Sequence, residues 1–273
     1  AMTAAGRIAR GRVFAVCHSL LADLWEPPRR NPVLRLFDLE HALRAFLACG
    51  HRLVVIEPGI QEEFAARFPD LAPSVLLWPH PLPVTVAAER PEPRRRPRIG
   101  FLGWTGGDKG FAAFLAAARE FSHAAEFHVV GHGQPGDGGA GPAELAALAT
   151  APRAEHWPRA AYRAQLAALD FVCMFYDARV YRYVASGVLM DALAAGIPVI
   201  APRIPLVARI AAAHGEIGLL YADAAARHAA VAEAVALCGT PRHAAMRRHV
   251  QDAAKARAPG TLAAIVARDL EPP

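Results

Sequence analysis

Two glycine-containing loops carry the residues whose types and spacing suit them to chemistry. The loop Gly103–Gly110 reads GWTGGDKG and contains Lys109, one of only two lysines in a chain that otherwise uses arginine for positive charge. The loop Tyr176–Gly187 runs into the small residues Ser186 and Gly187, where a helix is expected to begin. A helix start exposes N–H groups and the positive end of the helix dipole. A compact ammonium and a bare helix start both favour an anion such as phosphate.

Two further side chains are candidates for the same site. Asp191 lies one turn into the predicted helix, where it could accept hydrogen bonds from a ribose diol or only complement the helix dipole. His18 follows a predicted strand, either as a reactive group or as a loop histidine bonded to backbone. Without these ligands, residues 180–202 are an ordinary loop, helix and strand, so the residues alone leave both interpretations open.

Other familiar chemistry is not supported. Residues 131–136 match the G-x-G-x-x-G pattern, but they follow a second strand and no helix opens directly after them. The histidines at 123, 128, 132 and 156 have no ligand spacing and no cysteine pair, so no metal site is predicted. A G-x-S-x-G nucleophile motif is missing. No bound cofactor is expected.

Composition describes a globular protein with a large core. The chain has 273 residues, of which 54% are hydrophobic and 20% charged, and its net charge is +5. The densest basic patch, at 90–98, is broken by prolines and lacks aromatic residues, so nucleic-acid binding is not expected. This patch favours a solvated linker that touches anionic lipid head groups. No apolar run is long enough to span a membrane, and four unpaired cysteines indicate buried thiols. We therefore expect a cytoplasmic protein, peripheral at most at the inner membrane face.

The first part of the chain predicts a βαβαβ pattern. Strands are expected at 12–17, 51–56 and 75–78, with helices at 33–48 and 60–68. Three strands make half of a doubly wound domain and leave an exposed edge. The sequence therefore predicts a chain that begins partway through a longer protein, or a partner or oligomer that covers this edge. Residues 1–86 form this partial domain, and the proline- and arginine-rich residues 87–97 form a linker.

Residues 98–273 predict a second, longer α/β domain. Six strands are expected at 98–102, 127–130, 154–157, 171–175, 198–201 and 218–221, with helices between them and at 223–237, 241–256 and 261–269. The commonest order for six such strands is 3-2-1-4-5-6, in which a crevice opens beyond the carboxyl ends of strands one and four. Those ends carry the loops 103–110 and 176–187. The predicted topology therefore brings the lysine loop and the serine-glycine helix start to one site.

The ordered motifs also resemble a known family. RIGFLGWTGGDKGF, FHVVGHG, LAALDFVCMFYD, SGVLMDALAAGIPVIAP and GLLYAD resemble the C-terminal, donor-binding domain of GT-B fold glycosyltransferases of family 4. The resemblance covers residues 98–238. Residues 12–86 resemble, less clearly, the second half of the N-terminal acceptor domain. The resemblance implies two Rossmann-like doubly wound domains, with the N-terminal one partial. It also implies a retaining transfer of sugar from a nucleotide-diphosphate sugar, such as a UDP or GDP sugar, to an acceptor.

The resemblance assigns roles to individual residues. Lys109 would hold the diphosphate together with the loop residues Gly103, Gly106 and Gly107, and backbone amides of Ser186 and Gly187 would bind the same group. Asp191 stands where the family has the second glutamate of an E-x7-E motif, which binds the ribose. His18 would face the donor sugar. Such enzymes typically need no metal, because cations and the helix dipole offset the charge of the leaving group.

Two positions depart from the family pattern. Tyr183 stands in place of the first glutamate, and Trp104 stands in place of the arginine that assists the lysine. Losing a contact of this kind typically lowers the rate ~10²–10³-fold. Arg182 or Arg179 could restore the lost charge. The alternatives are a degenerate or truncated GT-B relative that binds nucleotide without catalysis and, less favoured, a nucleotide-sugar epimerase.

Overall fold

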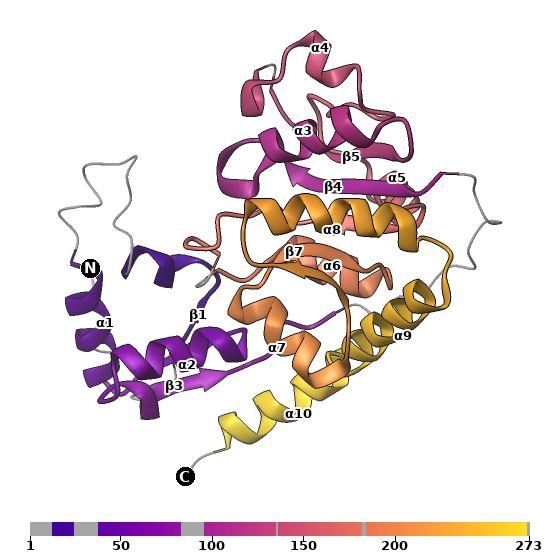
Figure 1. Ribbon diagram of the computed structural model, residues 1–273. Coiled ribbons are helices and arrows are strands. Elements are labelled where there is room, and N and C mark those ends of the chain that lie inside the picture. The colour runs from indigo at the N-terminus through magenta and orange to yellow at the C-terminus, as the bar shows by residue number, and fades with distance from the viewer. Residues whose placement is uncertain (1–12, 25–37, 83–95, 135, 182–183, 272–273) are drawn as a thin grey trace. The chain divides into compact units, whose positions relative to one another are not determined.

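The computed structural model describes residues 13–24, 38–82, 96–134, 136–181 and 184–271, and the chain divides into two compact units (Figure 1). The first unit comprises residues 1–81, 179–185 and 260–273. The second comprises residues 82–178 and 186–259. Most of the predicted linker 87–97, namely residues 87–95, lies outside the described residues.

The first unit contains a three-stranded parallel sheet in the order β1-β2-β3. Its strands are β1 (Phe14–Cys17), β2 (Arg52–Val55) and β3 (Val75–Leu77), accompanied by the 3₁₀ turns η2 (Leu20–Leu24) and η4 (Ala72–Ser74) and the helices α1 (Leu39–Ala48) and α2 (Pro58–Arg67). These elements confirm the predicted βαβαβ pattern. Strand β1 lies at one edge, where Val16 is 55% exposed. A partner that covers this edge stays a prediction.

Helix α1 begins later than the hydrophobic spacing predicts. The Asp38 carboxylate accepts a hydrogen bond from the His41 amide at 2.9 Å and so caps the helix at Leu39. The predicted start at residue 33 lies outside the described residues. Leu43 and Leu47, one turn apart, are buried in the core of the first unit together with Val55 and Phe64.

The C-terminal helix α10 (Pro259–Leu270) corrects the predicted domain boundary. The sequence places residues 260–273 with the C-terminal domain, but their contacts group them with the first unit. The indole N–H of Trp78, just after β3, donates to the Asp269 carboxylate at 3.0 Å. This contact joins residues 191 positions apart, and no local pattern predicts it.

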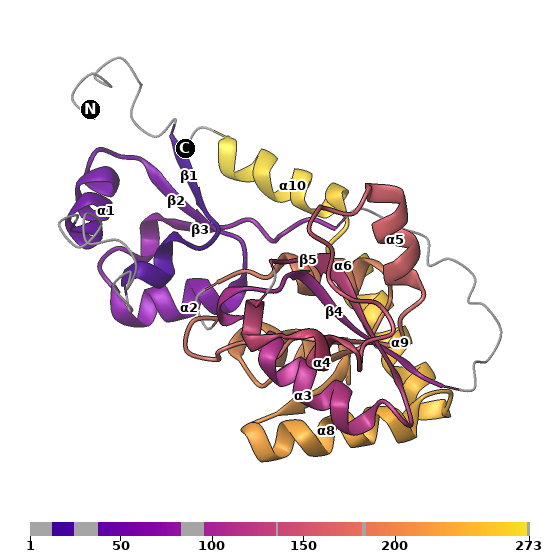
Figure 2. The ribbon, with the colours of Figure 1, turned by 90° about the horizontal axis from the view of Figure 1, so that it is seen from above.

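The second unit contains a five-stranded parallel sheet in the order β5-β4-β6-β7-β8. Its strands are β4 (Arg98–Trp104), β5 (Glu126–His132), β6 (Phe171–Cys173), β7 (Val199–Pro202) and β8 (Gly218–Tyr221). Its helices are α3 (Phe111–Phe121), α4 (Pro142–Leu145), α5 (Arg159–Ala167), α6 (Gly187–Ala194), α7 (Pro205–His214), α8 (Ala224–Leu237) and α9 (Pro241–Lys255), with 3₁₀ turns η5 (Gly107–Lys109) and η6 (Asp137–Gly139). Helices α3 and α8 lie side by side (Figure 2).

The strand predicted at 154–157 is wrong. In its place, Thr150 and Arg153 form isolated parallel bridges to His128 and His132 of β5. Pro152, between these two residues, has no N–H to donate, so a continuous ladder cannot form there. The remaining five strands follow the predicted 3-2-1-4-5-6 order with strand three missing. The observed order therefore still places β4 and β6 side by side, with the predicted crevice beyond their carboxyl ends.

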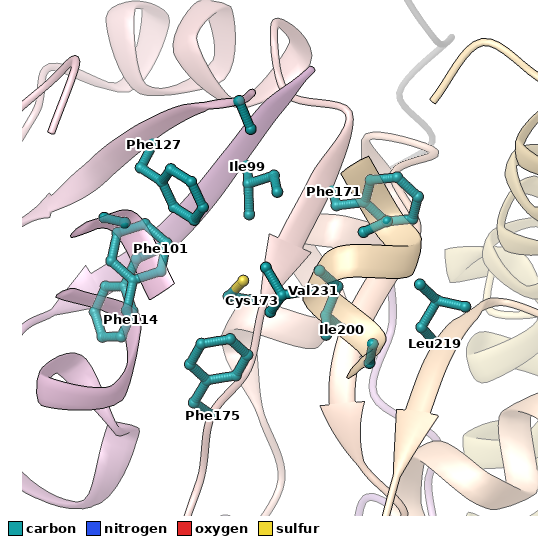
Figure 3. Packing of buried hydrophobic residues seen from close by; sticks show 14 of the residues in the cluster. Ile99, Phe101, Phe114, Phe127, Phe171, Cys173, Phe175, Ile200, Leu219 and Val231 are labelled. Atoms are coloured by element: carbon teal, nitrogen blue, oxygen red, sulfur yellow. The ribbon is translucent and has the colours of Figure 1, made fainter. Parts of the chain in front are cut away.

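Alternate residues of the second sheet bury both of its faces, as is typical of parallel sheets. On one face the strands contribute the aromatic residues Phe101, Phe127 and Phe171, which pack with Phe114 of α3 and Val231 of α8 (Figure 3). The alternate residues of the same strands, among them Leu102, Val130 and Val172, are also buried. A rigid two-sided core therefore holds the loops at the strand ends.

The described residues also test two expectations from the sequence, on membrane-spanning segments and on the cysteines. None of their helices is both long and apolar enough to cross a membrane. All four cysteines are free thiols; Cys17 and Cys173 are buried, whereas Cys238 is half-buried and Cys49 is exposed. The expectation of buried thiols is thus wrong for Cys49, which lies at the C-terminal end of α1 rather than on its apolar face.

Candidate functional site

The loop after β4 is held tightly to the ends of neighbouring strands. A Cβ placed on Gly110 would lie 2.0 Å from the backbone oxygen of Phe175, just after β6. Gly110 also has a φ of 76°, the left-handed conformation that favours glycine, and it directly precedes α3. A Cβ on Gly131 of β5 would lie 1.9 Å from the backbone oxygen of Gly103. Glycine at both positions permits the close backbone approach that positions the lysine loop.

Lys109 lies at the centre of this arrangement. A Cβ placed on Gly103 would lie 3.0 Å from the Nζ of Lys109 and 3.7 Å from the Cγ2 methyl group of Val188. The ammonium therefore lies beside the carboxyl end of β4 and near the first turn of α6. Burial lowers the pKa of Lys109, and among the described residues no carboxylate or other acceptor is bonded to its ammonium. A partly desolvated cation without a partner is a ready site for an anion.

The start of α6 is built as the sequence predicts. Ser186 is buried and its hydroxyl oxygen accepts a hydrogen bond from the Leu189 amide at 3.1 Å. The Tyr176 hydroxyl lies 2.9 Å from the same Ser186 oxygen and fixes the cap from the preceding loop. Because this cap satisfies only the Leu189 amide, the amides of Gly187 and Val188 have no acceptor within the helix. Gly196, with a φ of 67°, follows the C-terminal end of α6, as predicted.

Asp191 has a partner that the sequence did not indicate. The Tyr162 hydroxyl, from α5, donates to the Asp191 carboxylate at 2.7 Å. Burial raises the pKa of Tyr162 far above its ordinary range, and the negative charge of Asp191 raises it further. The tyrosine is therefore a fixed neutral donor, which holds one carboxylate oxygen in place. The other oxygen of Asp191 remains an acceptor for a ligand.

Trp104 is the most exposed large side chain of the lysine loop. Its indole is 42% exposed. A Cβ on Gly106 would lie 2.3 Å from the indole ring, and one on Gly107 would lie 3.2 Å from it. The indole thus lies against these two glycines and presents an aromatic surface at the position where the family pattern has an arginine.

The end of β5 adds a polar cluster that the sequence analysis did not assign to the site. The His132 and His156 rings have centroids 3.8 Å apart. Burial lowers the pKa of His132, and the charges of His156 and Lys109 lower it further. Asp137 accepts hydrogen bonds from the Gln134 amide and from the Thr105 hydroxyl, and these bonds lower its pKa. The signal for this cluster was the glycine-rich turn after the strand, GHGQPG, which a dinucleotide interpretation did not fit.

The remaining predicted site residues belong to the first unit or lie outside the described residues. His18 is exposed at the end of β1 in the first unit, 6.0 Å from the ring centroid of His80. Its role toward a donor sugar stays a prediction. Arg182 and Tyr183 lie outside the described residues. Arg179 belongs to the first unit. Among the described residues, no three His, Cys, Asp or Glu side chains are grouped to hold a metal ion.

The comparisons with known proteins identify the class of protein. Residues 96–237, just over half of the chain, match the family model of glycosyl transferases group 1. The chain belongs to this family, and the lysine loop, the helix start and Asp191 all lie inside the matched segment. The comparison with curated proteins gives no match.

Solved structures show the same fold at low sequence identity. A mutant of TarM from S. aureus, solved with fondaparinux, alpha-GlcNAc-glycerol and UDP, is 10% identical with a TM-score of 0.63. That match covers 95% of this chain and 50% of TarM, so this chain spans about half the TarM length. An alpha,alpha-trehalose-phosphate synthase (UDP-forming) from Burkholderia vietnamiensis is 12% identical with a TM-score of 0.63. It covers 96% of this chain, which spans 70% of the synthase.

A third neighbour is a trehalose-6-phosphate protein of E. coli, solved with UDP-2-fluoro glucose. It is 11% identical with a TM-score of 0.64, and the match covers 98% of this chain and 70% of that one. Together these likenesses confirm the predicted GT-B type α/β fold with parallel sheets, whereas the partial N-terminal domain stays a prediction. They concern the fold alone, since all three identities are low.

Proposed function

We propose that the second unit binds a nucleotide-diphosphate sugar and that the protein transfers the sugar to an acceptor with retention of configuration. The observation that carries this proposal is Lys109, a partly buried ammonium with a lowered pKa beside Gly103. No described side chain balances its charge. A diphosphate would supply that balance, and the membership of the chain in a glycosyltransferase family gives the reaction class.

The diphosphate would be bound from two sides. Lys109 would contact it from the loop after β4, and the free amides of Gly187 and Val188 would donate from the first turn of α6. Hydrogen bonds to charged groups contribute about 1.5–3 kcal/mol each. Lysine and helix start would then stabilise the leaving diphosphate without a metal ion. Uridine or guanosine diphosphate is the expected leaving group.

The sugar nucleotide would be oriented by the surrounding side chains. Asp191, held by Tyr162, would accept hydrogen bonds from the ribose hydroxyls. The exposed Trp104 indole would pack on the nucleotide sugar in place of an arginine. In a retaining transfer with leaving group and acceptor on one face, a diphosphate oxygen can itself take the acceptor proton, so no separate base is needed. His18 is proposed to face the donor sugar, and an acceptor glycan, lipid or small molecule completes the reaction.

Thermal unfolding with nucleotides tests the donor site. The full chain is heated with UDP, GDP, ADP and their sugars. A ligand at 100 times its dissociation constant raises the free energy of unfolding by ~2.7 kcal/mol, which is a clear melting shift. We expect a shift with one nucleotide that disappears in Lys109→Ala. Lys255→Ala is the matched control, since Lys255 is an exposed lysine paired with Asp252 at the end of α9.

Two outcomes would overturn the proposal at different points. If no nucleotide shifts the melting temperature, or if Lys109→Ala keeps the full shift, the donor site is wrong. If the nucleotide binds but the enzyme releases no nucleoside diphosphate from the matching sugar nucleotide, with or without candidate acceptors, binding stands and transfer is refuted. The protein would then be a binding relative without catalysis.

A further inference from the structure

Strand β8 forms the free edge of the second sheet, and part of its backbone is unpaired. On its inner side, the Val199 amide donates to the Ile217 oxygen and the Arg203 amide donates to the Tyr221 oxygen. Because backbone groups alternate sides along a strand, Gly218 and Leu220 direct their N–H and C=O groups away from β7. Among the described residues, none forms a hydrogen bond with these four groups.

A hollow of about 670 Å³ lies along this edge. Its lining includes Gly218 and Leu220, together with alanines from the flanking helices, Ala211 of α7 and Ala226 and Ala229 of α8. The hollow therefore combines unpaired backbone donors and acceptors with small apolar side chains. Its volume lies within the ~300–1,000 Å³ typical of ligand sites. An extended peptide that adds to the edge would satisfy the backbone groups and place small side chains against the alanines.

The two ends of the hollow differ in charge. Next to the amino end of β8, Arg242 bonds to both oxygens of Glu216, at 2.5 and 3.0 Å, and to Glu233 at 2.5 Å. These three side chains together carry one negative charge. At the carboxyl end, Arg203 is exposed, and among the described residues its guanidinium has no carboxylate partner. A strand that runs parallel to β8 would bring its amino end to the glutamates and its carboxyl end to Arg203.

We propose that this hollow is a docking site for the C-terminal tail of a partner protein, bound as an added parallel strand. The tail has small apolar side chains, a basic residue near the glutamate end and a free carboxylate that pairs with Arg203. A tail fits better than the β8 edge of a second copy, because that edge carries its own α7 and α8 beside the strand. The site is independent of the proposed glycosyl transfer, which uses the crevice beyond the carboxyl ends of β4 and β6, because β7 separates β8 from these strands in the sheet.

Fluorescence polarisation with a labelled peptide tests this proposal. The probe is a hexapeptide with a lysine at its amino end, alternating alanine and valine, and a free carboxylate; the same peptide ending in an amide is the comparison. We expect saturable binding of the carboxylate peptide to the full chain and weaker binding of the amide. Arg203→Gln should weaken binding of the carboxylate peptide to the level of the amide, because it removes the proposed partner of the carboxylate, which is the only charge that the amide peptide lacks.

Matched variants on α8 locate the binding. Ala229→Tyr fills the hollow and should weaken the peptide at least about tenfold, which corresponds to ~1.4 kcal/mol. Ala232→Tyr is the control: it is also an exposed alanine of α8, but it does not line the hollow, and it should bind as the wild type does. Circular dichroism melting confirms that both variants are folded.

Three results would overturn the proposal. The first is no saturable binding of either peptide. The second is binding that Ala229→Tyr and Ala232→Tyr leave equally unchanged. The third is a dimer in analytical ultracentrifugation that Ala229→Tyr alone dissociates while the peptide does not bind, since the edge would then serve contacts between copies of this chain.

Discussion

Replacing Gly110 by alanine would test how tightly the lysine loop is held against β6. Two costs are expected. At a φ of 76°, an alanine pays about 1–2 kcal/mol for the left-handed conformation. Its Cβ would also lie 2.0 Å from the backbone oxygen of Phe175, so backbone must move. Forcing atoms into a packed site typically costs a further ~1–3 kcal/mol. Alanine also restricts the unfolded chain, which offsets ~0.4–1 kcal/mol, so we expect Gly110→Ala to lower the free energy of unfolding by about 1–4.5 kcal/mol.

Gly239→Ala is the matched control for this prediction. Gly239 has a similar φ of 82°, but a Cβ placed there would meet no atom within 4 Å. It therefore carries only the conformational cost, reduced by the ~0.4–1 kcal/mol that alanine gains by restricting the unfolded chain. Urea unfolding measures both variants, compared by their midpoints at unchanged slope. Gly110→Ala should also weaken nucleotide binding, because the movement displaces Lys109.

Equal destabilisation of the two alanine variants would refute this reasoning. It would mean that the loop shifts freely and that the close approach to Phe175 does not hold it. Destabilisation by Gly110→Ala with unchanged nucleotide affinity would refute the second step, in which the close approach positions the ammonium.

Three further predictions concern the polar groups of the site. Tyr162→Phe removes the donor to Asp191 and should lower the free energy of unfolding by about 1–3 kcal/mol in urea, whereas Asp191→Asn should weaken nucleotide binding more than it weakens the fold. Thr105→Val removes the side-chain donor to Asp137, so the pKa of Asp137 measured by NMR titration should rise. An unchanged pKa would show that the Thr105 hydroxyl does not stabilise the Asp137 carboxylate. Because the pKa of His132 is lowered in the folded protein, this histidine binds a proton more readily in the unfolded chain. The contribution of neutral His132 to the free energy of unfolding is therefore complete above pH ~6.5 and is lost as the pH falls below that value. His132→Gln should reduce this loss of stability as the pH falls below ~6.5, and an identical pH profile in the variant would contradict the assignment.

Much of the fold could be predicted from the sequence, because buried parallel strands and capped helices have characteristic local sequence patterns. The apolar runs of β4, β5 and β7 and the glycine after α6 predicted these elements, because the signal for each element lies in residues that are close in the sequence. The strand predicted at 154–157 failed because the pairing at Thr150 and Arg153 depends on β5, and Pro152 interrupts it. The sequence assigned α10 to the wrong unit because its Asp269 accepts a hydrogen bond from Trp78 of the first unit, which is 191 positions away in the chain.

The sequence by itself also predicted the kind of site. A lysine in a glycine loop, a serine-glycine helix start and an α/β strand order were enough to predict an anion site at the carboxyl ends of two strands. Only the tertiary structure decided the electrostatics of that site. The lowered pKa of Lys109 arises from its burial in the folded chain, and the bond from Tyr162 to Asp191 joins two helices. Residue types fix which groups can ionise or donate, whereas desolvation and distance, which the folded chain alone sets, decide how strongly they do so.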